Sequence, residues 1–217
     1  GALVLVTLYV LVGLKFNDKS GWLSAFVSIA AIITARSWRA GLALTPVAII
    51  AALYMWSGLV STDEYSISTR FDAWIIMGQI IKLNPILGLG FANYYWYTPL
   101  FPIRGYAVSF NSHNNYVDIV AQTGLVGLFC VLWFFWEVGW LGWRLRKDAP
   151  SGFAQAYVYG ALGVLAGMVV AGMFGDWVLP FFYNIGLNGF RSSMLGWLFL
   201  GGMVSLTQMK YSKVSPK

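Results

Sequence analysis

Charge is scarce in this sequence. Only 10% of its 217 residues are Asp, Glu, Lys or Arg, whereas soluble domains carry about 25%. The chain is 59% hydrophobic and 18% aromatic, and its mean hydropathy is +0.68. These values exclude an ordinary soluble domain and indicate a membrane protein.

Residues that form disulfides or bind metals are few as well. The single cysteine, Cys130, excludes an intramolecular disulfide. No CxxC or HExxH motif occurs. The DxD pattern, whose carboxylates hold a metal and a nucleotide diphosphate in many sugar transferases, is also missing. We therefore expect no metal site and no cofactor, and an active site built on cations would suit a diphosphate.

Long apolar runs take the place of charge. Because a membrane span needs about 20 apolar residues, we expect an all-α fold, a polytopic transmembrane helical bundle that forms a single membrane domain over residues 1–217. The first run is short and the chain begins without Met, so we expect a span cut short in a fragment of a larger protein; a signal peptide is the alternative. The expected spans are residues 1–14, 21–35, 40–60, 124–143, 153–174 and 186–208.

Basic residues predict the orientation. Eight of the fourteen Lys and Arg lie in RSWR (36–39), RLRK (144–147) and the tail 210–217. An alternating path places all three segments on one side, which the positive-inside rule assigns to the cytoplasm. Residues 61–115 then form a long extracytoplasmic loop. Its aromatic-rich composition indicates a structured loop rather than a disordered one.

Within this loop, residues 68–82 predict an amphipathic helix on the membrane surface. Phe71, Trp74, Met77 and Ile81 recur at intervals of three or four residues. Ser68 or Thr69 is a candidate cap at its beginning.

His113 is the only histidine of the chain. Imidazole exchanges a proton near neutral pH, which makes this side chain a candidate general base or acid. Ser112 is expected to cap the following helix and to leave His113 in its first turn. The alternative is an interfacial histidine that only binds water or lipid.

Three further cations share the expected outer side. Arg70 opens the surface helix, and its planar guanidinium suits phosphate oxygens; binding of lipid head groups is the alternative. For Lys19 the alternative is snorkelling at the end of a span. Arg191 pairs either with Asp176 or with a ligand.

Three stretches of the sequence carry a family resemblance. They are DKSGWL (18–23), RFDAWIIMGQIIKLNPILGLGFANY (70–94) and SHNNYVDIVAQTGLVG (112–127). In this order they resemble the C-terminal half of the O-antigen ligase and O-antigen polymerase family of bacterial membrane proteins, over residues 15–143. The second and third stretches are specific, and the first is weak because Lys19 stands where the family more often has arginine.

The resemblance implies a multi-pass protein of the bacterial plasma (inner) membrane that takes part in lipopolysaccharide or polysaccharide biosynthesis. Such glycosyltransferases move a glycan from an undecaprenyl diphosphate carrier to an acceptor hydroxyl of a glycan, lipid or protein on the periplasmic side. The implied catalytic residues are His113 and Arg70. The implied substrate-binding residues are Lys19, Arg70, Trp74, Asn114, Asn115 and Arg191.

Other functions remain open at this point. A polymerase of the same family would use the same donor, and some relatives have been labelled bicarbonate carriers, so a transporter of a small anion is an alternative. A membrane scaffold without a site is a third. The lipid bilayer is an expected partner in every case, and a nucleic acid is not.

Overall fold

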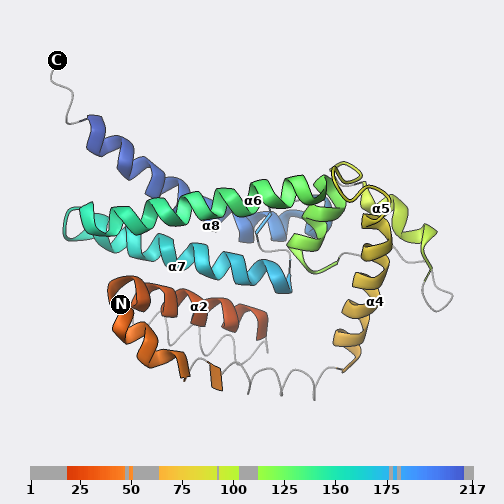
Figure 1. The fold of residues 1–217 in the computed structure, drawn as a ribbon, viewed down its shortest axis with the longest axis horizontal. Coiled ribbons are helices and arrows are strands. Elements are labelled where there is room, and N and C mark those ends of the chain that lie inside the picture. The colour runs from red at the N-terminus through yellow and green to blue at the C-terminus, as the bar shows by residue number, and fades with distance from the viewer. Residues whose placement is uncertain are drawn as a thin grey trace.

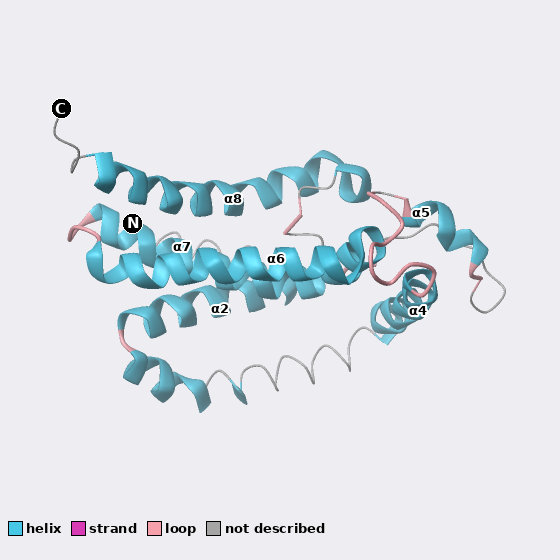
Figure 2. Cartoon of the chain, turned by 45° about the horizontal axis from the view of Figure 1, so that its top comes forward, coloured by secondary structure: helices cyan, strands magenta, loops and turns pink. Residues whose placement is uncertain are grey.

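The structure is a computed structural model that describes residues 19–46, 49–50, 64–91, 93–102, 112–175, 178–179 and 182–212. Within these residues the regular elements are all helical, as predicted, and no strand occurs (Figure 2). The elements are α2 (Lys19–Arg36), α4 (Glu64–Ile81), α5 (Tyr94–Tyr97), the 3-10 turn η1 (Thr98–Leu100), α6 (Asn115–Asp148), α7 (Phe153–Phe174) and α8 (Phe182–Ser212).

Four long helices lie side by side. Helix α7 contacts α2, α6 and α8 and therefore occupies the middle of the group (Figure 1). The core between α6, α7 and α8 consists of apolar side chains and includes Phe135, Val158, Leu165 and Met203. Large apolar side chains also cover the outside, where Trp136 is 70% and Phe129 is 63% exposed. An apolar exterior around an apolar core is expected of helices that face lipid.

Two of the described helices, α6 and α7, are long and apolar enough to cross a membrane, and Leu23–Arg36 within α2 forms a shorter apolar helix. The bounds of α7 coincide with the expected span 153–174. The expected spans 21–35 and 186–208 lie inside α2 and α8. Residues 1–14 and most of the second half of the span 40–60 lie outside the described residues.

Small residues allow α2 and α7 to approach closely. A Cβ atom added at Gly163 would lie 2.9 Å from the carbonyl oxygen of Ser28, and one added at Gly167 would lie 3.0 Å from that of Ser24. Two turns of α7 therefore touch the backbone of α2. Close backbone contact through small residues is typical of helix pairs in membranes.

Helix α4 runs across one end of this group rather than along it (Figures 1 and 2). It begins at Glu64, before the predicted caps Ser68 and Thr69. The predicted apolar stripe is also wrong in part: Met77 is buried, but Phe71 is 54% exposed. The buried face is instead the one that α6, α5 and the intervening loop cover; its residues are Ala73, Ile76, Met77 and Ile80.

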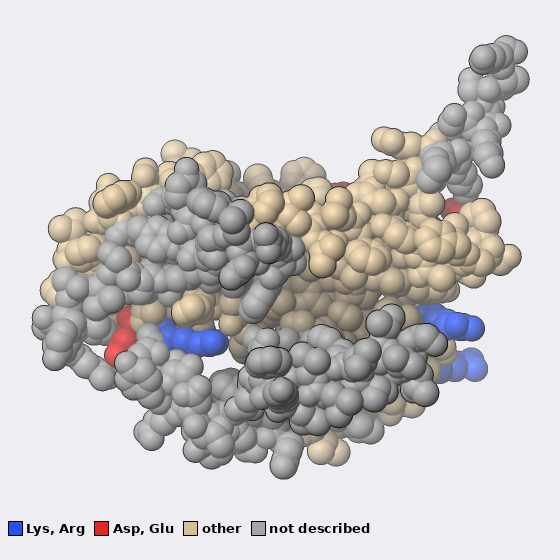
Figure 3. Space-filling model, turned by 180° about the vertical axis from the view of Figure 1, so that it is seen from behind, with Lys and Arg blue, Asp and Glu red and all other residues tan. Residues whose placement is uncertain are grey.

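The basic turns lie at the end opposite α4. In Figure 1 the turn after α2, the α6–α7 turn and the C-terminal end of α8 are together at that end. Arg36 and Arg39 are exposed in the first turn, and Arg144 and Lys147 are exposed at the end of α6. Figure 3 shows Lys and Arg side chains gathered there. The fold thus separates one basic end from the end that carries α4 and the first turn of α6.

Candidate functional site

Arg70 lies in the second turn of α4 and reaches the end of α7. Its Nη1 donates a hydrogen bond to the carbonyl oxygen of Phe174, the last residue of α7, at 3.3 Å. A cation at this position is favoured by the partial negative charge of a helix C-terminus. This is the only hydrogen bond of the guanidinium among the described residues, and a guanidinium carries five N–H donors in all.

Trp74 follows Arg70 by one helical turn and connects α4 to the segment before α6. Its Nε1 donates a hydrogen bond to the carbonyl oxygen of Ser112 at 3.1 Å. The indole also makes an edge contact with Phe71, at 5.6 Å between ring centroids. Residues one turn apart share a helix face, so α4 presents Arg70 and Trp74 towards the end of α7 and the residue preceding His113.

His113 is exposed at the tip of a short loop and has a left-handed backbone conformation, with φ of 51°. The prediction that Ser112 caps α6 is wrong, because the N-cap is Asn114, whose Oδ1 accepts hydrogen bonds from the backbone N–H groups of Tyr116 and Val117 at 3.0 and 3.2 Å. His113 therefore precedes the helix instead of lying in its first turn.

Two buried polar side chains hold this loop in place. Ser112 and Asp118 are both fully buried. The Ser112 hydroxyl donates to Asp118 Oδ1 at 2.7 Å and has Asn114 O as a second acceptor at 2.9 Å. It also accepts a hydrogen bond from the backbone N–H of Asn114 at 3.1 Å. The loop that carries His113 is thus fixed on both sides by one serine.

Sequence reasoning missed Asp118 and the part played by Ser112. The only available signal was a carboxylate in the first turn of a helix, where the helix dipole favours negative charge. The hydrogen bond between Ser112 and Asp118 depends on the left-handed backbone conformation at His113, which no residue pattern predicts.

Asn115 and its neighbour connect α6 to the segment after α7. Asn115 is 1% exposed, and its Oδ1 accepts a hydrogen bond from the backbone N–H of Val178 at 2.8 Å. The hydroxyl of Tyr116 donates to the carbonyl oxygen of Val169 at 2.6 Å. The structure thus assigns structural hydrogen bonds to Asn114 and Asn115, and their contact with a substrate stays a prediction.

For the other two predicted binding residues the structure describes the backbone but not the side chain. Lys19 is the first residue of α2, and Arg191 lies in α8. The helices that carry Lys19 and Arg191 therefore begin at the end of the fold where α4 lies (Figure 1).

Comparison with protein families gives a match to the sequence. The family model of the O-antigen ligases matches residues 1–132, more than half of the chain. The chain belongs to the O-antigen ligase family. Searches of the curated proteins and of the solved structures gave no match.

Membership confirms the resemblance seen in the sequence. The matched range contains α2, α4 and the first half of α6, and with them Lys19, Arg70, Trp74 and the loop of His113. Glycan processing by a membrane enzyme follows from the family. The individual roles of the residues do not follow from it and stay predictions.

The described part of this O-antigen ligase relative contains no cluster of three or more His, Cys, Asp or Glu residues that could hold a metal ion.

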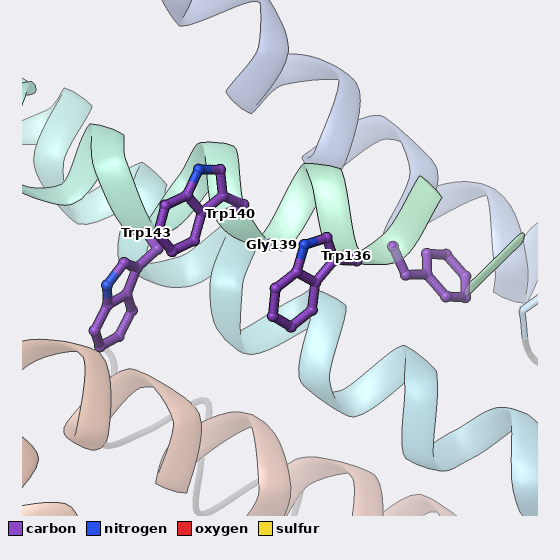
Figure 4. Close-up of a pocket in the computed structure, with 5 residues that line it drawn as sticks. Trp136, Gly139, Trp140 and Trp143 are labelled. Atoms are coloured by element: carbon purple, nitrogen blue, oxygen red, sulfur yellow. The ribbon is translucent and has the colours of Figure 1, made fainter. Parts of the chain in front are cut away.

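A groove of about 300 Å³ lies elsewhere, on the outer side of α6. The indoles of Trp136, Trp140 and Trp143 follow one another along the helix, and Gly139 leaves a gap between them (Figure 4). At the basic end, the guanidinium of Arg146 stacks on Trp143 at 3.6 Å from the ring centroid. None of the predicted site residues lines this groove, so it is separate from the candidate site.

Proposed function

We propose that the protein is a glycosyltransferase of the O-antigen ligase type, which moves a glycan from an undecaprenyl diphosphate carrier to an acceptor hydroxyl. The observation that supports this most is the link between its two candidate groups. Arg70 and Trp74 lie one turn apart on α4, and Trp74 donates to the residue that precedes His113. The candidate diphosphate-binding cation and the candidate proton acceptor are thereby linked through one hydrogen bond between α4 and the His113 loop.

In the proposed reaction, the acceptor oxygen attacks the anomeric carbon of the donor sugar. The bond between that carbon and the diphosphate oxygen breaks, and undecaprenyl diphosphate leaves with the electron pair. His113 takes the proton of the acceptor hydroxyl as the new bond forms. Arg70 donates hydrogen bonds to the diphosphate, whose negative charge increases as the bond breaks, and such fixed donors lower the barrier most in a site with little water.

The orientation is part of the proposal. The end with the basic turns faces the cytoplasm by the positive-inside rule, so the end with α4 faces the periplasm of the bacterial inner membrane. Helix α4 runs across the long helices (Figure 1), and this direction suits a helix on the membrane surface. The polyprenyl tail would then remain in the bilayer while the diphosphate reaches Arg70 at the depth of the head groups.

Replacement of Arg70 or His113 by Ala in the full-length protein tests the proposal. Transfer from a purified lipid-linked donor in proteoliposomes should fall at least a hundredfold in each variant. The change in Arg70→Ala should include a raised KM for the donor. Arg39→Ala is a matched control, because Arg39 is exposed at the opposite end, and it should transfer like the parent. Full transfer by both site variants would eliminate the proposed function.

A polymerase of the same family would use the same donor and the same two residues, so the acceptor decides between them. Parallel reactions with a lipid A core acceptor and with a second lipid-linked repeat unit separate the two functions. The proposal of a ligase requires the first acceptor to be used.

The break in α6 at Gly124 bears on the transporter alternative, because interrupted membrane helices often bind ions or substrates. The backbone groups freed by this break are bonded to residues 85–90. They are therefore not offered to an anion. Uptake of labelled bicarbonate into the same proteoliposomes would be measured in parallel, and we expect none above that of empty liposomes.

A further inference from the structure

Helix α6 is interrupted at Gly124, where φ is 67° and ψ is −169°. In an unbroken helix the N–H groups of Leu125 and Val126 would bond to the carbonyls four residues earlier, those of Ala121 and Gln122. Both bonds are replaced. Leu125 N donates to Pro85 O at 2.9 Å, and Val126 N donates to Ile86 O at 3.3 Å.

The two carbonyls left without helical donors are bonded to the same loop. The N–H of Leu89 donates to Ala121 O and the N–H of Gly90 donates to Gln122 O, both at 2.9 Å. Residues 85–90 thus insert into the gap and exchange two helical hydrogen bonds for four. We name this arrangement, residues 85–90 with residues 121–126, the interlock.

The interlock depends on two glycines, one on each side. Gly88 and Gly124 both have positive φ, of 70° and 67°. A Cβ at Gly88 would collide with the backbone of Gln122, and a Cβ at Gly124 would collide with the backbone of Ile86. Backbone atoms cannot move aside as a flexible side chain does, so each position excludes every other residue type.

Two further hydrogen bonds hold the loop. Asn84 holds its beginning, since its side-chain oxygen accepts from the N–H of Leu87 at 3.2 Å and its backbone oxygen accepts from that of Gly88 at 2.9 Å. Asn84 follows α4 after only two residues, Lys82 and Leu83. Any shift of the loop against α6 therefore moves α4.

Apart from the hydrogen bond between Trp74 and Ser112, the contacts between α4 and the first part of α6 are apolar. The cluster between α4 and α6 contains Ile76, Met77, Ile80 and Ala121, and such contacts are not directional. The four hydrogen bonds of the interlock are directional, and a backbone exposed by a broken membrane helix is tolerated where the protein itself satisfies it.

We propose that the interlock is a positioning device, which fixes α4 against α6 on both sides of the break at Gly124 and so sets the separation between the Arg70 guanidinium and the His113 loop. Gly88 and Gly124 are its positioning residues. The effect of the interlock on catalysis rests on the proposed function. The fixed position of one helix against the other does not depend on that function.

The rate of catalysis is sensitive to the distance between reacting groups. A displacement of about 1 Å between reacting groups costs about a hundredfold in rate. Loss of the interlock leaves Arg70 able to bind the diphosphate but misplaces His113. The expected signature is a fall in kcat with little change in the KM for the donor, in contrast to Arg70→Ala.

The test compares Gly88→Ala and Gly124→Ala with Gly78→Ala in the full-length protein. Gly78 is the matched control, because it lies in α4 and a Cβ added there meets nothing within 4 Å. Gly90→Ala is a milder variant: φ is 91° there, but the added Cβ meets the side chain of Asn93 rather than backbone. We expect kcat to fall more than tenfold in the first two variants, to fall less in Gly90→Ala and to stay unchanged in Gly78→Ala.

A distance measurement tests the geometry directly. Spin labels are placed at Ile75 on α4 and Phe129 on α6, two exposed positions, after replacement of Cys130 by Ser. The parent and Gly78→Ala should give one narrow distance distribution. Gly88→Ala and Gly124→Ala should give a broadened or shifted one.

The outcomes separate the two proposals. If either Gly88→Ala or Gly124→Ala inserts and shows an unchanged distance distribution, or an unchanged kcat while Arg70→Ala is impaired, the interlock does not position the site. If Arg70→Ala and His113→Ala transfer like the parent, the proposed function is wrong, and the spin-label distances alone then decide whether the interlock fixes α4 to α6.

Discussion

The support of the His113 loop by Ser112 makes a quantitative prediction. Ser112→Ala removes a hydroxyl that is fully buried and donates to Asp118 Oδ1 at 2.7 Å. The change also deprives the backbone N–H of Asn114 of its acceptor. A buried polar group without a partner costs about 1 to 3 kcal/mol, so we expect the free energy of unfolding to fall by about 2 kcal/mol.

The matched control is Ser205→Ala in α8. Its hydroxyl also bonds to a carbonyl, that of Gly201 at 3.0 Å, but the residue is exposed. The carbonyl of Gly201 lies inside α8 and keeps its helical hydrogen bond when the hydroxyl is removed, so the change should stay within about 0.5 kcal/mol. The two variants carry the same chemical alteration and differ in burial.

Denaturant titration of the purified protein in detergent micelles measures both variants. Glycan transfer is measured on the same samples, because a loosened His113 loop should lower kcat as well as stability. Equal stability of Ser112→Ala and Ser205→Ala would refute the reasoning. It would mean that the Ser112–Asp118 hydrogen bond does not hold the loop.

Three further variants probe other contacts. Trp74→Phe removes the donor to Ser112 O and should lower kcat about tenfold, the equivalent of about 1.4 kcal/mol. Its control is Trp140→Phe, in the groove of α6. Equal activities of the two variants would contradict the prediction. Asn115→Ala leaves the N–H of Val178 without its side-chain acceptor and should cost about 1 to 3 kcal/mol in denaturant titration. Gly167→Leu should separate α2 from α7 and lower the melting temperature. Gly201→Leu should not lower it, because a side chain at Gly201 meets no neighbour within 4 Å. A normal melting temperature for Gly167→Leu would show that the close contact is dispensable.

Several local expectations failed for one reason. Ser112 is a good capping residue, but its hydroxyl is bonded to Asp118, and Asn114 caps α6 instead. Phe71 fits an apolar stripe, yet α6 and the loop cover the neighbouring face of α4, which contains Ile76 and Ile80. In each case a contact with a residue distant in sequence overrode a local preference, as tertiary packing commonly does.

The sequence alone determined the helical class and the family. Apolar runs specify helices because a backbone in lipid must satisfy its own hydrogen bonds, and the motifs around Arg70 and His113 mark the O-antigen ligase family. Only the tertiary structure decided how those motifs meet. Gly88 and Gly124 lie 36 positions apart, and the backbone hydrogen bonds that join their segments depend on the path of the chain between them, which no local pattern encodes.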